Sequence, residues 1–120
     1  MKILTIITIL FFINFPVHSY MASGTGMKSC KEWLNTSNEA ANNVTAKGII
    51  RASTIQWIRG YLSALNFLSE MNRKKYKDVS GIKGEYLIFS LQEYCLENQD
   101  SIIEDFTLKL WSQLPTIDNN

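Results

Sequence analysis

The chain has 120 residues, with 12 basic and 11 acidic residues and a formal net charge of +1. Lys and Arg are mostly scattered among carboxylates, so the sequence offers no strong basic face for nucleic acid. The length excludes a large multidomain protein and predicts a single domain.

The first 19 residues have the three parts of a secretory signal peptide. Met1-Lys2 gives a positive start, residues 3–15 are almost continuously apolar, and Pro16 breaks the run before Val17-His18-Ser19. We expect cleavage after Ser19, with Ala22 as a second choice, and a periplasmic product. An uncleaved membrane anchor is the alternative, but about 13 apolar residues are short for the roughly 20 that span a bilayer.

Removing this segment changes the chemistry of what is left, residues 20–120. The loss of Lys2 leaves 11 basic residues against 11 acidic ones, so the mature chain is formally neutral. The only histidine, His18, leaves with the signal. The mature chain therefore has no imidazole for general base catalysis or metal ligation, and no membrane segment is expected in it.

The two cysteines, Cys30 and Cys95, are expected to form an intramolecular disulfide. Export places them in an oxidising compartment, and a count of two leaves one pairing within the chain. A bridge closing a loop of this length stabilises by roughly 4 kcal/mol on the chain-entropy model. Two buried free thiols and an intermolecular link are the alternatives.

The periodicity predicts helices in the first half of the mature chain. A short helix is expected over 29–34, with Ser29 as N-cap and Glu32 completing a capping box. The asparagine-rich stretch 35–43 is read as a loop that holds at most a helical turn. The stretch 54–68 then repeats apolar residues at three- and four-residue steps, which predicts a central core helix that ends near Met71.

Two more helices are expected after a loop over residues 78–83. The segment 84–98 has helical spacing, and a last helix is expected from Asp100 or Ser101 to Leu114, with Ser101 and Glu104 as its capping box. No strong strand signal is present. The sequence therefore predicts an all-α fold, a small bundle of about four helices with an ordered core over 29–114 and one disulfide joining the first and third helices.

A search for catalytic or cofactor-binding patterns finds none. The sequence has no glycine-rich phosphate loop, nucleophile elbow or metal-ligand spacing. Glu93 and Glu97 are four residues apart on the third predicted helix, but they alternate with its apolar side and are interpreted as a solvated face. We therefore expect no enzyme activity and no cofactor.

Three segments together resemble a known family. They are SCKEWL at 29–34, Gly60-Tyr61-Leu62 in the apolar helix, and EYCLEN at 93–98, followed by an amphipathic last helix. This order resembles the HdeA/HdeB-like proteins, small periplasmic acid-stress chaperones, over roughly residues 29–114. Cys30 and Cys95 match that family's disulfide cysteines, and Asn98-Gln99 stands where Asn-Pro is common.

The resemblance implies a protein that binds unfolding clients in acid. Protonating the 11 carboxylates would take the mature charge from about zero to about +11, which would loosen a small helical domain. The disulfide would keep the loosened chain compact. Client-binding surface would come from the large apolar aromatic residues Trp33, Trp57, Phe67, Phe106 and Trp111.

A second group is similar in outline, the periplasmic immunity proteins that neutralise type VI secretion amidase effectors. Their Gly-Tyr-x-x-Gly-like segment is similar to residues 60–64, with Ala64 in place of the second glycine, but their extra cysteines are missing here. On this reading the loop 73–83, with Tyr76 and Lys77, is expected to enter the partner's cleft. An accessory subunit of a secretion system is a third reading, and a homodimer is compatible with each of them.

Overall fold

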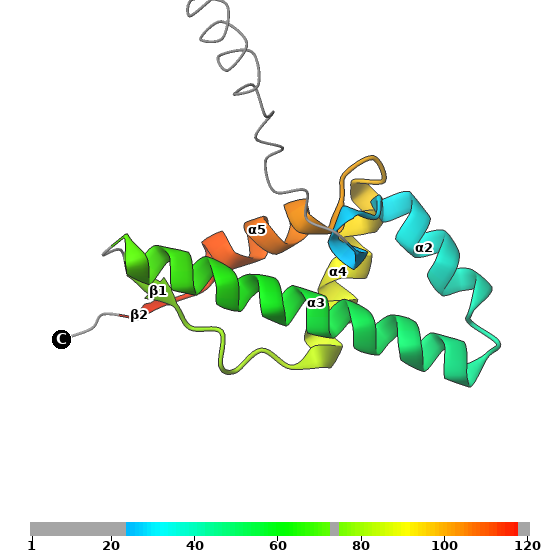
Figure 1. Cartoon of the computed structure of the whole chain (residues 1–120). Helices are drawn as coiled ribbons and strands as arrows, with labels where there is room; N and C mark the ends of the chain where they lie inside the picture. The colour runs from blue at the N-terminus through cyan, green and yellow to red at the C-terminus, as the bar shows by residue number, and fades with distance from the viewer. Residues whose placement is uncertain (1–23, 73–74, 118–120) are drawn as a thin grey trace, which may run out of the picture.

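The computed structural model describes residues 24–72 and 75–117, so the expected signal peptide and its cleavage sites lie outside the described residues. The described chain is mostly helical, as predicted, with a short helical turn and four α-helices, of which α3 is the long central one (Figure 1). In chain order the elements are η1 (Thr25–Met27), α2 (Cys30–Glu39), α3 (Val44–Met71), β1 (Tyr76–Lys77), α4 (Gly84–Glu97), α5 (Ile103–Gln113) and β2 (Thr116–Ile117).

The central helix α3 runs the length of the domain, and α4 and α5 pack against different parts of it (Figure 1). Ile58 and Leu62 of its predicted apolar face point into the core, whereas Leu68 at the end of that face is 53% exposed. It begins where the Asn43 side chain accepts from the backbone N–H of Ala46 at 3.0 Å, and it ends at Met71 as expected. This polar cap is a sequence feature typical of helix starts.

The first helix is longer than predicted. It continues through the polar stretch that the sequence suggested was a loop and ends at Glu39. Ser29 caps it as expected, with its hydroxyl accepting from the N–H of Glu32 at 3.1 Å. The added turns are held because Trp33 is buried in the core and the Thr36 hydroxyl donates back to the Glu32 carbonyl at 2.9 Å. Packing here overrides weak local propensity.

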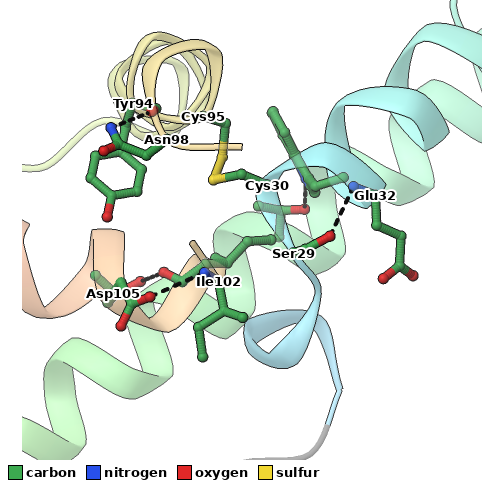
Figure 2. Close-up of a disulfide and its surroundings, with 12 residues drawn as sticks. Ser29, Cys30, Glu32, Tyr94, Cys95, Asn98, Ile102 and Asp105 are labelled. Carbon is green, nitrogen blue, oxygen red and sulfur yellow. Dashed lines mark hydrogen bonds between the residues drawn. A yellow bond between two sulfur atoms is a disulfide. The ribbon is translucent and has the colours of Figure 1, made fainter. Parts of the chain in front are cut away.

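The predicted disulfide joins α2 to α4, the first and third of the four helices (Figure 2). Cys30 and Cys95 are fully buried, and their Cα atoms are 4.8 Å apart. Beside it the chain makes a short antiparallel bridge between Ser29 and Ile102. The start of α2 therefore meets the end of α4 and the start of α5 at this end of the core.

The start of α5 differs from the prediction. The helix begins at Ile103, and the carboxylate of Asp105 accepts from the N–H of Ile102 at 3.1 Å (Figure 2). Ser101 does not cap it, because its carbonyl accepts from the N–H of Cys30 at 2.7 Å and holds the backbone extended. The expected capping box of Ser101 and Glu104 is therefore wrong.

Two short strands were not predicted. Tyr76–Lys77 and Thr116–Ile117 pair antiparallel, so the segment after α5 lies beside the segment that follows α3. Two-residue strands carry no periodic signal, so no pattern in the sequence predicts them.

Eleven apolar side chains form one buried core between α2, α3, α4 and α5. They are Cys30, Trp33, Ile58, Leu62, Leu87, Ile88, Leu91, Cys95, Ile103, Phe106 and Leu110. The two glycines at close approaches are Gly26, which lies against the Trp57 ring, and Gly84, which lies against Ile55. No described helix is long and apolar enough to cross a membrane.

Candidate functional site

The side chains predicted to bind a partner do not gather on one surface. Trp33 and Phe106 are core residues, with exposed fractions of 4% and 5%. Trp57 is half-buried and stacks on Tyr61, with ring centroids 4.9 Å apart. Of the predicted apolar set, Phe67 is the well exposed member, at 62%. Trp33 and Phe106 thus offer a client little surface while the core is closed.

Tyr76 and Lys77, the residues expected to enter a partner's cleft, form strand β1 and are half-buried. The side-chain amide of Asn66 accepts from the N–H of Lys77 at 2.9 Å and donates to its carbonyl at 2.8 Å. The same Asn66 oxygen accepts from the indole N–H of Trp111 at 3.0 Å. Asn66 therefore fixes both β1 and α5 to the end of α3, and Trp111 is part of this network.

The exposed apolar surface with the clearest pattern lies on the last turns of α3. Phe67, Leu68 and Met71 are 62%, 53% and 65% exposed, and their three- and four-residue spacing places them on one face. We call these three residues the α3 stripe. Of these three residues, only Phe67 was predicted from the sequence to belong to a binding surface.

Carboxylates lie at the contacts between helices. The guanidinium of Arg51 on α3 pairs with Glu85 on α4, and the hydroxyl of Tyr61 on α3 donates to Glu104 on α5. Together with Asp105 at the start of α5, these groups connect or cap three of the four helices. The sequence held no signal for the two interhelical pairs, because the partners are 34 and 43 residues apart.

Two ionisable groups have shifted pKa values. Burial raises the pKa of Tyr61 from 10.0 to about 12, and the hydrogen bond to Glu104 acts in the same direction. The hydrogen bonds from the hydroxyl and backbone N–H of Ser80 lower the pKa of the exposed Asp78. Tyr61 is thus a neutral donor to Glu104 at physiological pH.

The helix α4 lies between pockets on two of its sides. One, of about 250 Å³, lies between α2, the start of α3 and α4, with Trp33 among the side chains that line it. The other, of about 350 Å³, lies between α4 and α5, and Glu93 and Glu97 line it with Phe106. Within the described ranges no three His, Cys, Asp or Glu residues are placed to hold a metal ion. Glu93 and Glu97 are exposed, as a solvated face requires.

Comparison with known proteins gives no relative: no family model, no curated protein and no solved structure matches this chain.

Proposed function

We propose that the protein is an exported, non-enzymatic protein-binding protein that acts as an acid-stress chaperone. The observation that carries this proposal is the position of its carboxylates, which join α3 to α4 through Glu85 and α3 to α5 through Glu104. Carboxyl groups lose their charge near pH 4, and protonation removes the ion pair and weakens each accepted hydrogen bond.

Acid would then act on the domain in two ways. The contacts of α3 with α4 and α5 weaken, while unneutralised Lys and Arg side chains repel one another. The disulfide between Cys30 and Cys95 is unaffected by protonation, so α2 and α4 stay linked. Separation of α5 from α3 would uncover Phe106 and Ile58, and these core residues supply the apolar surface for a client.

The test is light scattering of an aggregation-prone client brought to about pH 3 with and without the oxidised protein. We expect suppression of aggregation in acid but not at pH 7, and loss of suppression when the disulfide is reduced. Glu85→Gln removes the ion pair with Arg51 at every pH, and Glu104→Gln replaces the charged acceptor of the Tyr61 hydroxyl with a weaker neutral one. Both variants should therefore raise the pH at which the protein opens and protects the client.

Glu93→Gln is the matched control, because Glu93 is an exposed glutamate with no partner among the described residues. It should leave that pH unchanged. A protein that keeps its helical circular dichroism and its near-ultraviolet signal at pH 2 would exclude the chaperone proposal.

The second candidate is an immunity protein that binds and inhibits a secreted amidase-type effector. The observation that favours it is the α3 stripe, which is exposed while the protein is folded. A stoichiometric complex with one identified protein at pH 7 would support it. The double variant Phe67→Ser, Met71→Ser should abolish that complex, whereas Leu108→Ser on α5, which replaces another exposed apolar residue, should not.

A further inference from the structure

The pocket between α2, the start of α3 and α4 has features that the acid-chaperone proposal does not use. In Figure 1, α2 and the first turns of α3 diverge from the turn at residues 40–43, and α4 lies at the wide end of this V. Here α2 packs on α4 rather than along α3, which leaves the space between the two open. Trp33, Ile50 and Ile88 line it with apolar surface.

The polar groups at this pocket favour an acidic ligand. Lys47 and Arg51 both line it, but Arg51 is paired with Glu85. Lys47 is exposed, and within the described part of the chain no carboxylate lies in salt-bridge reach of its ammonium group. The pocket thus combines apolar walls with one uncompensated positive charge.

Ser37 is a second polar residue at this pocket whose side chain lacks a partner in the described part of the chain. It lines the pocket, and its hydroxyl is the one buried side-chain polar group in the described ranges without a hydrogen-bond partner. A buried hydroxyl that is left unpaired costs free energy, so a polar ligand atom that reaches it after a rotation about χ1 is favoured.

The size of the pocket limits what it holds. About 250 Å³ is below the roughly 300–1,000 Å³ usual for small-molecule and cofactor sites. A single large side chain of a protein partner fits this scale, with a neighbouring carboxylate positioned for Lys47. We propose that this pocket, in the folded protein at neutral pH, binds a protein segment in which a large apolar residue is followed by an acidic one.

This site is independent of acid opening, since it requires α2, α3 and α4 to be in place. Failure of the chaperone assay would leave it unaffected, and failure of the peptide test below would leave the chaperone proposal unaffected.

The experiment is a titration of the full mature, oxidised protein at pH 7 with blocked dipeptides, followed by nitrogen-15 NMR. The probe is acetyl-Phe-Glu-amide, and its neutral and cationic counterparts are acetyl-Phe-Gln-amide and acetyl-Phe-Lys-amide. For a ligand of this size we expect a Kd on the order of 1 mM. Shifts should concentrate on Ser37, Lys47, Ile50 and the indole N–H of Trp33.

The charge should set the order of affinity. The acidic peptide should bind about threefold more tightly than the neutral one, as for an exposed ion pair, and the cationic peptide should bind most weakly. Lys47→Gln should remove the difference between the acidic and neutral peptides. Lys83→Gln is the matched control, because Lys83 is exposed and does not line the pocket, and it should keep the difference.

Filling the pocket is the second test. Ser37→Leu removes the unpaired hydroxyl and fills part of the pocket. Ala41→Leu fills part of the pocket from an exposed position. Each variant should weaken binding by at least about tenfold. The proposal is overturned if the peptides shift no pocket residue, or if Lys47→Gln leaves the order of affinity unchanged. Shifts of these residues on raising the protein concentration alone would assign the pocket to a second copy of the chain and would overturn it too.

Discussion

The indole N–H of Trp33 donates to the hydroxyl of Thr54 across 3.1 Å, inside the core and between α2 and α3. Thr54 is 1% exposed, and its own hydroxyl donates to the Ile50 carbonyl at 2.7 Å. A single hydroxyl therefore satisfies the indole N–H of a buried tryptophan. Aromatic residues with a polar atom need such a partner when they are buried.

Thr54→Val should lower the free energy of unfolding by about 1–3 kcal/mol, because the indole N–H is left buried without an acceptor. Thr107→Val is the matched control: Thr107 is equally buried and bonds back to its own helix at Ile103, but it accepts from no other element. Urea denaturation of the two variants measures the difference. Equal losses would mean that the bond between α2 and α3 contributes nothing.

Asn66 is the residue on which the pairing of β1 with β2 depends. Asn66→Ala removes two bonds to Lys77 and one to Trp111, so we expect a loss of about 2–3 kcal/mol and faster amide exchange at Lys77. Asn72→Ala removes one bond, to the Leu68 carbonyl within α3, and should change stability by less than about 1 kcal/mol. Unchanged exchange at Lys77 in Asn66→Ala would contradict this account.

Local signals predicted the central helix, the third helix and the disulfide, because apolar periodicity and a pair of cysteines behind an expected signal peptide are readable without knowing the fold. The start of α5 was missed for a non-local reason. Ser101 has a side chain typical of a helix cap, but its backbone carbonyl accepts a hydrogen bond from the N–H of Cys30, which lies far away in sequence.

The candidate site was less predictable than the fold. Exposure of Phe67 and burial of Phe106 depend on which face of each helix meets α3, and both residues read as equally apolar in the sequence. The pocket at α2 depends on the angle between two helices, and the sequence had suggested a loop over half of α2. No local pattern specifies such an angle.

Gly26 sits where a side chain has no room. A Cβ there would lie 1.8 Å from the Trp57 ring, so Gly26→Ala must displace η1 or rotate the indole, at a cost of about 1–3 kcal/mol. Gly60→Ala makes the same chemical change on α3 in open space and should stabilise by about 0.5–1 kcal/mol through helix propensity. Thermal unfolding followed at 222 nm should therefore shift in opposite directions for the two variants.

Asp105 is expected to stabilise the start of α5. Asp105→Ala loses the acceptor for the Ile102 N–H, so at pH 7 it should lower the free energy of unfolding by about 0.5–2 kcal/mol. Asp100→Ala, at an exposed aspartate with no partner among the described residues, should show no such loss in urea denaturation at the same pH.

The ionisation of Tyr61 should make the stability of the protein fall at alkaline pH. Its pKa is about 12 in the folded protein against 10.0 for an ordinary tyrosine, with burial the largest cause and Glu104 the next. A folded pKa that is raised above the unfolded one gives stability that is fully present below about pH 10 and is lost as the pH rises towards 12. Urea midpoints should accordingly fall over that interval in the wild type.

Glu104→Gln tests the cause of this shift, because an amide still accepts from the hydroxyl but carries no charge to oppose the phenolate. The pKa of Tyr61 should fall in this variant while staying above 10.0, since burial remains. Carbon-13 NMR of labelled tyrosine rings measures it, and Tyr61→Phe identifies the resonance among the five tyrosines of the chain. A Tyr61 that titrates at the same pH in Glu104→Gln would show that burial alone sets its pKa and that the charge of Glu104 contributes nothing to it.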